Sequence, residues 1–282
     1  MKVDQRALAG IEGKIARADQ HFRVLHDEMA AWDADRPWRL VPEVHDQGRK
    51  HFYRLHMLNP IPVDWAVILG EAVHDLRSAL DQCVYWLGVD WTGDEIPYCS
   101  FPVFTKGTKF YERTKHGAWT RRSGMNKIRG IGPGPKAFIE ALQPYPQRYK
   151  RTFCREVRAT HDLWNQDKHR LVHLWGLRFS VSETRLPQNL AADCVIGIDR
   201  RVLHDRAIVL KIVCDPPHAE VQMDGKITAA ITIHGGKGRV TPSLSLWDMN
   251  RTVVDVIRKL VDAIGHQDDS INLAVWSAPS VE

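Results

Sequence analysis

Residues 64–88, DWAVILGEAVHDLRSALDQCVYWLG, decide the fold that we expect for this chain. Apolar side chains recur in this stretch at steps of three and four, which is typical of one face of an α-helix. The face consists of Leu69, Val73, Leu76, Leu80, Cys83 and Leu87. Asp64 is a suitable N-cap and Gly88 suits a C-terminus, so we predict a helix over residues 64–88.

A second face of the same helix is polar. It carries Glu71, His74, Ser78, Asp81 and Tyr85, again at steps of three and four. Arg77 and Asp81 form an i,i+4 pair on this helix. Two interpretations remain open. The face is either solvated, with an ion pair worth at most ~0.5 kcal/mol, or a row of His, carboxylate and hydroxyl groups facing a cleft.

Residues 153–175, FCREVRATHDLWNQDKHRLVHLW, predict a second polar helix. His161, Asn165, His169 and His173 recur in it every four residues, flanked by Asp167 and Lys168. Histidine suits proton transfer near neutral pH, and an i,i+4 pair can share a metal. The HExxH pattern is absent and no acidic ligand is set by spacing, so no metal is predicted. A structural role, acid–base work and phosphate contact all remain open.

The flanking segments extend this pattern. A helix is predicted over residues 4–33, a β-hairpin over 38–58 and a short helix over 135–142. Residues 89–132 are long, basic and irregular, which is typical of a mobile lid or a surface loop. After Gly176 the periodicity changes to the near-alternation of strands, predicted over 177–181, 192–198, 207–214, 220–223 and 228–234. A final helix is predicted over 247–264.

The expected fold class is therefore α+β. Residues 1–176 would form a helical core of about five helices, with the hairpin at 38–58 and the basic loop at 89–132. Residues 177–265 would form an antiparallel sheet closed by a helix, and 266–282 a polar tail. If the hairpin joins the later sheet, the two parts form one domain instead.

The composition is typical of a soluble protein. Hydrophobic residues make up 44% and charged residues 26% of the chain. The charged N-terminus lacks the apolar core of a signal peptide, and no apolar run is long enough to span a membrane. The five cysteines are scattered without a CxxC pair, which favours neither a zinc ribbon nor a disulfide framework. A reducing compartment, and hence a cytoplasmic location, is expected.

Two basic clusters stand out against a modest net charge of +5. Within residues 109–129 one cluster comprises Lys109, Arg113, Lys115, Arg121, Arg122, Lys127 and Arg129, opposed by Glu112. The other comprises Arg148, Lys150, Arg151, Arg155 and Arg158. Each cluster is either a solvated face or a surface for nucleic acid. No GxSxG elbow and no P-loop spacing is present.

Four segments carry a resemblance to a known group of proteins. They are VHDLRSALDQCVYWL at 73–87, FPVF at 101–104, IEALQPY at 139–145 and HDLWNQDKHRL at 161–171. In this order they resemble a widespread family of uncharacterised actinobacterial and phage-associated proteins, which have "HNLRSALD", "FPIF", "LQPY" and "NxDKHR"-like elements. The resemblance covers roughly residues 60–175 and implies a shared fold without an assigned activity.

The chain also distantly resembles HEPN-type helical ribonucleases. Those proteins carry an Arg and a His separated by four to six residues on one helix, and they are usually paired across a dimer. Here Arg77 is followed by Gln82 where that motif has His, whereas Arg155 and His161 keep the spacing. The resemblance implies RNA as a partner and a homodimer, and Gln82 departs from its catalytic pattern.

Three functions follow as hypotheses. The first is a nucleic-acid-directed helical module of RNase type, in which His161 or His169 does acid–base work on RNA or another polyanion. The second is a non-catalytic binding or regulatory protein whose polar faces form a structural network. The third is a metallohydrolase. The candidate catalytic residues are His74, Asp81, His161 and His169; the candidate binding residues are Arg77, Arg155, Asn165, Asp167 and Lys168, with no cofactor and no membrane partner.

Overall fold

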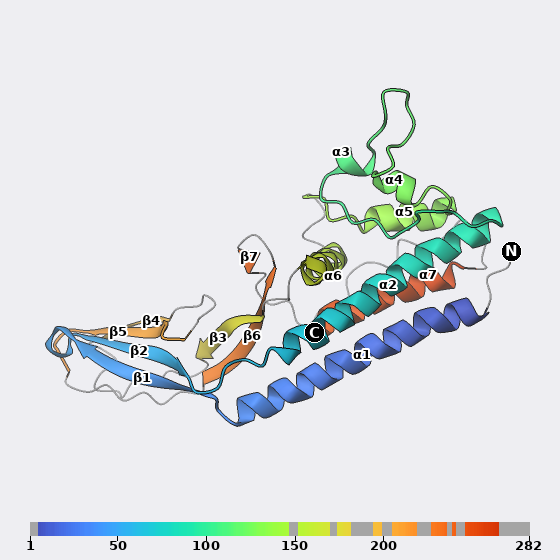
Figure 1. The fold of residues 1–282 in the computed structure, drawn as a ribbon. Helices are drawn as coiled ribbons and strands as arrows, with labels where there is room; N and C mark the ends of the chain where they lie inside the picture. Colours follow the sequence, from blue (N-terminus) through green and yellow to red (C-terminus); the bar gives the residue numbers. More distant parts are fainter. Residues whose placement is uncertain are drawn as a thin grey trace, which may run out of the picture. The chain divides into compact units, whose positions relative to one another are not determined.

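The computed structural model describes residues 5–146, 152–169, 174–181, 194–198, 205–218, 227–235, 239–240 and 246–264. Figure 1 shows the fold. The helices are α1 (Gln5–Ala34), α2 (Asp64–Thr92), α3 (Gly107–Phe110), α4 (Gly124–Lys127), α5 (Pro133–Ala141), α6 (Thr152–His169) and α7 (Leu246–Asp262). The strands are β1 (Trp38–His45), β2 (Lys50–Met57), β3 (Leu174–Val181), β4 (Cys194–Ile198), β5 (Ile208–Cys214), β6 (Ile227–Gly235) and β7 (Arg239–Val240). The α+β class with a helical core is confirmed.

The chain divides into two compact units. A helical unit comprises residues 1–23, 68–170 and 243–282, and a sheet unit comprises residues 24–67 and 171–242. This division differs from the predicted boundary at residue 176. The hairpin β1–β2 belongs with the later strands because β2 pairs with β5. The C-terminal helix α7 belongs with the helices because it packs against α6.

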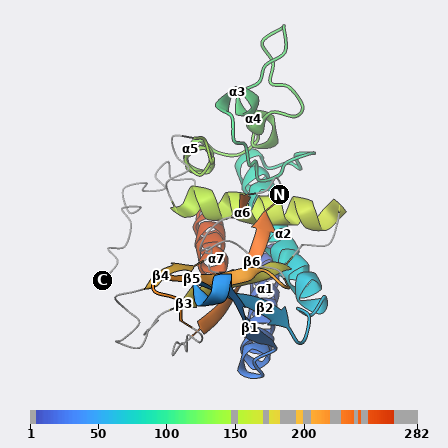
Figure 2. The same ribbon diagram turned by 90° about the vertical axis from the view of Figure 1, so that its left-hand side faces the viewer.

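The core of the helical unit is built on α2. Its predicted apolar face is buried along its whole length, from Leu69 to Leu87, which confirms the helical pattern. Helix α7 lies against this face, since the Cys83 thiol donates to the carbonyl oxygen of Ile257 at 3.9 Å. Helix α1 adds Ile11, Ile15, Ala18 and Phe22 to the buried set. Helix α6 crosses α2 and α7 (Figure 2), so its side chains can meet those of α2.

The sheet unit contains two antiparallel sheets. One has the strand order β1-β2-β5-β4 and the other β3-β6-β7. The predicted hairpin is confirmed, with Trp38 opposite Met57 and His45 opposite Lys50. Its turn requires Gly48, which has a φ of +90° and whose missing Cβ would lie 2.4 Å from the carbonyl oxygen of His218.

One cysteine corrects a prediction. Cys214, at the end of β5, is disulfide-bonded, whereas the scattered cysteines predicted no such bond. The antiparallel register places Cys194 of β4 directly opposite Cys214, 20 positions away in the sequence. Spacing alone did not indicate this neighbour because strand register depends on tertiary pairing. Cys83, Cys99 and Cys154 are free thiols.

Two helix ends also differ from the prediction. Helix α2 passes through Gly88 and ends at Thr92, where Gly93 takes a φ of +77° and supplies the left-handed C-terminal residue. Helix α6 ends at His169 and Leu174 begins β3, so the predicted helix to residue 175 is too long. His173, the predicted strand at 220–223 and the polar tail at 266–282 lie outside the described residues. Among the helices described, none is long and apolar enough to cross a membrane.

Replacement of Gly124 should destabilise the helical unit. A Cβ at this position would lie 2.2 Å from the buried ring of Phe110, which cannot easily move. Gly124→Ala should therefore lower the free energy of unfolding by about 1–3 kcal/mol, measured by urea denaturation. Gly13→Ala on α1 is the matched control. Its Cβ meets nothing within 4 Å, and it should stabilise the protein by roughly 0.5–1 kcal/mol. Equal effects of the two variants would contradict the described packing.

Candidate functional site

A buried ion pair on α2 organises the candidate site. The guanidinium of Arg77 is 3% exposed and donates through Nη2 to Asp81 Oδ1 at 2.8 Å and to the carbonyl oxygen of Phe101. The same Asp81 oxygen accepts the Phe101 N–H at 2.8 Å. Both backbone polar groups of Phe101 are thus satisfied by side chains of α2. Burial raises the pKa of Asp81 and lowers that of Arg77, while each partner's charge opposes the shift.

Gln143 continues this attachment from the other side. Its fully buried amide accepts the Phe104 N–H at 2.9 Å and donates to the carbonyl oxygens of Pro102 and Ile139, both at 2.9 Å. Residues 101–104 are therefore held by hydrogen bonds to α2 at one end and to Gln143, just after α5, at the other. The FPVF, LRSALD and LQPY segments quoted above are the partners in this network.

Helix α6 faces Arg77 with an aromatic ring. The Arg77 guanidinium carbon lies 5.1 Å from the centroid of the Trp164 ring, and the Lys168 ammonium lies 3.9 Å from the same centroid. Trp164 thus contacts two cations, an arrangement that its π-electrons stabilise. The two predicted polar helices therefore meet at side chains that lie beside the predicted polar stripes.

His161 is held as a neutral imidazole. Its Nε2 lies 2.9 Å from the amide nitrogen of Asn165, which donates, so the ring proton is on Nδ1. Nδ1 is buried and has no hydrogen-bond partner among the described residues. Burial lowers the pKa of His161 to about 3, helped by the positive charges of Arg77, Lys127 and Lys168. This nitrogen is a donor whose hydrogen bond no described residue satisfies.

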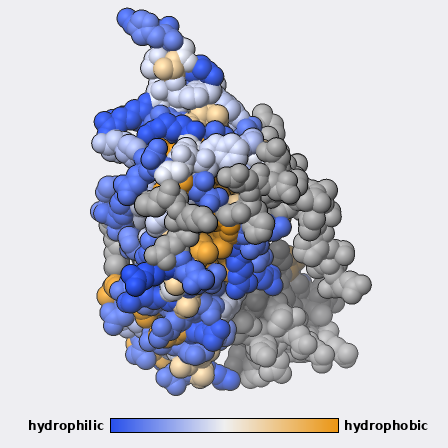
Figure 3. All heavy atoms as spheres, turned by 90° about the vertical axis from the view of Figure 1, so that its right-hand side faces the viewer, coloured by the Kyte–Doolittle hydropathy of each residue, from blue (hydrophilic) through white to orange (hydrophobic). Residues whose placement is uncertain are grey.

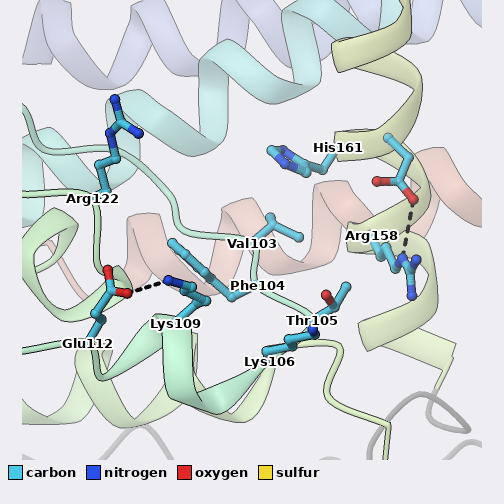
Figure 4. Close-up of a pocket in the computed structure, with 10 residues that line it drawn as sticks. Val103, Phe104, Thr105, Lys106, Lys109, Glu112, Arg122, Arg158 and His161 are labelled. Carbon is cyan, nitrogen blue, oxygen red and sulfur yellow. Dashed lines mark hydrogen bonds and ion pairs between the residues drawn. The ribbon is translucent and has the colours of Figure 1, made fainter.

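A pocket of about 480 Å³ opens beside His161. Figure 4 shows the imidazole extending from α6 toward Val103 and the inside of the pocket. The lining residues are Val103, Phe104, Thr105, Lys106, Lys109, Glu112, Arg122, Arg158, His161 and Asp162. Lys109 and Arg122 come from one predicted basic cluster and Arg158 from the other, so the pocket contains members of both.

The charge of the pocket is positive. It has four basic residues, Lys106, Lys109, Arg122 and Arg158, against two acidic ones. Each acid is already neutralised, Glu112 by Lys109 and Asp162 by Arg158 at 3.2 Å. The charged ends of Lys106 and Arg122 form no ion pair with any residue that the structure describes. Figure 4 shows Arg122 across the pocket from α6.

The predicted site residues fall into three groups. Arg77, His161 and Lys168 contact Trp164, and Asp81 and Asn165 are hydrogen-bonded to Arg77 and His161 in turn. Asp167 lies elsewhere on α6. Its carboxylate occupies the space that a side chain at Gly70 would fill, burial raises its pKa, and the nearby charge of His74 opposes that rise.

Two predicted residues do not join either group. Arg155 is paired with the buried Glu156 at 2.9 Å, and His169 is exposed at the end of α6. Neither makes an ion pair or hydrogen bond with Arg77 or the pocket in the described part of the chain. The helix turns His161 inward and His169 outward, although their spacing predicted one stripe.

The described residues hold no group of three or more His, Cys, Asp or Glu side chains that could bind a metal ion. Neither a family model nor a curated protein nor a solved structure matches this chain. The arrangement of the site itself therefore carries the functional argument.

Loss of the Gln143 amide should loosen the wall of the pocket. Gln143→Leu leaves the buried N–H of Phe104 and the carbonyl of Pro102 without partners, and each orphaned group costs about 1–3 kcal/mol. We expect a decrease of at least about 2 kcal/mol in the free energy of unfolding, measured by urea denaturation. Gln20→Leu, at an exposed position of α1, is the control and should change stability little. A stable Gln143→Leu variant would show that the network is dispensable.

Acid should destabilise the protein through His161. The folded-state pKa of about 3 lies below the ordinary 6.5, so between these values the unfolded chain binds the proton more tightly. This contribution to stability is present above about pH 6.5 and is lost as the pH falls toward 3. Between about pH 7 and pH 5 the loss should be on the order of 1–2 kcal/mol.

His161→Gln should remove that part of the pH dependence, measured as the difference in unfolding free energy from wild type at each pH. His169→Gln is the control because its imidazole is solvated in both states. A wild-type slope in the His161→Gln variant would contradict the buried, neutral histidine.

Proposed function

We propose that the helical unit binds a phosphate-bearing polyanion, with RNA as the expected partner. The observation that carries this proposal is the charge of the pocket. Both of its acids are already paired, whereas Lys106 and Arg122 have no ion-pair partner among the described residues. Backbone contacts to nucleic acid are made largely by such Lys and Arg side chains.

His161 supports the same proposal through hydrogen bonding. A neutral imidazole whose protonated Nδ1 has no partner among the described residues can donate to a phosphate oxygen that enters through the pocket. The proton donor stays in place because Asn165 fixes the tautomer from the other side of the ring. Proximity of an anion would also offset the positive charges of Arg77, Lys127 and Lys168 around this ring.

The Arg77–Asp81 pair has a different role in this proposal. Arg77 Nη2 and Asp81 Oδ1 bond to each other and to the Phe101 backbone, while Nε and Nη1 of Arg77 are buried without a hydrogen-bond partner among the described residues. In this proposal the pair positions the pocket wall, and neither residue lines the pocket. The structural network of the second hypothesis and the binding site of the first are then adjacent parts of one arrangement. Metal-dependent hydrolysis has no such supporting observation.

A catalytic alternative is that the helical unit also cleaves the RNA that it binds. An acid–base catalyst works best with a pKa near the working pH, and a pKa of about 3 makes free His161 a poor base at neutral pH. Binding is therefore the function that the geometry supports first. Cleavage would require a bound phosphate to raise the pKa of His161. Incubation of RNA with wild type and His161→Gln in EDTA tests it, since equal cleavage by both would exclude His161 as the catalyst.

The binding proposal predicts a salt-dependent affinity that depends on Lys106 and Arg122. Each of Lys106→Gln and Arg122→Gln should weaken RNA binding and reduce the slope of log K against log salt concentration by about 1. Fluorescence anisotropy titrations with labelled RNA at several salt concentrations measure both quantities.

Arg258→Gln provides the matched control for this experiment. It removes one exposed positive charge from α7, on the helical unit but outside the pocket lining. Its salt slope should equal that of wild type. Equal losses in all three variants would mean that net charge, and not the pocket, attracts RNA. If wild type shows no salt-sensitive binding of RNA, the proposed function is wrong.

A further inference from the structure

We propose that the bound polyanion is a single-stranded nucleic acid whose bases stack on an aromatic track beside the pocket. The aromatic track is defined here as Phe104, Phe110, Tyr111 and Trp119, together with Tyr98. This inference rests on the proposed function, because the pocket would hold the phosphate backbone of the same strand.

The track begins inside the pocket. Phe104 lines the pocket, and its ring centroid lies 5.9 Å from that of Phe110. Phe110 is 4.9 Å from Tyr111, and Tyr111 is 6.4 Å from Trp119. Consecutive rings thus lead from the phosphate pocket to the loop between α3 and α4. Phe110 is fully buried and supports the others, whereas Tyr111 is 37% exposed.

A cation lies against three rings of the track, those of Trp119, Tyr98 and Phe104. The guanidinium carbon of Arg113 lies 3.5 Å from the centroid of Trp119, and that of Arg121 lies 4.5 Å from Tyr98. The Lys127 ammonium lies 5.8 Å from Phe104. A ring for the base and a cation for its phosphate is the combination that single-strand-binding proteins use. The two features therefore occur together at three places along residues 98–127.

Tyr98 is connected to the pocket through consecutive arginines. Arg121 covers the Tyr98 ring, and the next residue, Arg122, lines the pocket. The Tyr98 side chain is 71% exposed and its backbone has a φ of +64°, a conformation that costs free energy in a non-glycine residue. Arg121 contacts the Tyr98 ring, and the rest of this strained residue's aromatic surface is open to solvent, where a base can stack on it.

The loop that carries Arg113 and Trp119 is accessible. It turns at Thr114–Gly117, is closed by the bridge between Arg113 and Trp119, and projects beyond α3 and α4 (Figure 1). In Figure 3 the top of the molecule is a largely hydrophilic projection with few hydrophobic side chains. This surface suits a charged, solvated strand better than the apolar face of a protein partner.

Single-stranded nucleic acid fits the track better than a duplex. In a duplex the faces of the bases are stacked on their neighbours and cannot reach Tyr98 or Trp119. In a single strand every base has a free face, so stacking on aromatic side chains tolerates any sequence. Inorganic polyphosphate carries the negative charge but has no bases. Its binding therefore depends on the pocket alone, and comparison with RNA isolates the contribution of the track.

The test compares three probes on the full chain: a labelled single-stranded RNA, the blunt duplex of the same length, and long-chain polyphosphate. Wild type should bind the single strand more tightly than the duplex at equal salt. Tyr98→Leu and Trp119→Leu keep apolar bulk but remove the aromatic ring. Each should weaken single-strand binding about tenfold and leave polyphosphate binding unchanged.

Trp247→Leu is the control, because it removes a partly exposed indole on α7 and should bind all three probes as wild type does. Tyr98 is so exposed that its variant should fold, which keeps the test valid if Trp119→Leu unfolds. Wild-type affinity of Tyr98→Leu for the single strand would overturn the track, as would equal affinity for duplex and single strand. Failure of wild type to bind polyphosphate or RNA would instead overturn the proposed function itself.

Discussion

The hydrogen bonds between Arg77, Asp81 and the backbone of Phe101 are the constraint on which the candidate site depends. A buried guanidinium is tolerated only when it is paired, and here a carboxylate one helical turn away and a carbonyl oxygen provide that pairing. The ion pair in turn fixes residues 101–104, which would otherwise be a free connection after α2. Gln143 holds the same segment from α5, so the wall of the pocket is attached at both ends.

This attachment explains why positive charge collects beside His161. The fixed segment leads directly into Thr105 and Lys106, and it faces the side of α6 that carries Arg158. Arg77 itself adds a buried positive charge that lowers the pKa of His161. Burial is the main reason why His161 stays uncharged, and the nearby charges of Arg77, Lys127 and Lys168 lower its pKa further.

The sequence predicted what depends on local pattern. Periodicity identified the buried face of α2, and spacing paired Arg77 with Asp81. It did not indicate that Phe101 is their third partner, because that contact spans 24 positions. Nor did it bring Arg122 to Arg158, since each came from a separate basic cluster whose meeting depends on how α6 crosses the helical unit. The role of Gln143 was likewise hidden, although the segment that contains it was noted for its resemblance.

The amide of Asn165 has an evolutionary consequence. It differs from an aspartate by one terminal group, yet the two side chains have opposite hydrogen-bonding roles toward the neighbouring imidazole. The amide donates to Nε2 and keeps His161 uncharged, whereas a carboxylate at the same distance would accept from that nitrogen and favour the imidazolium. A single substitution in an unchanged frame would therefore convert a neutral imidazole held by an amide into a carboxylate–imidazolium pair that can give up a proton.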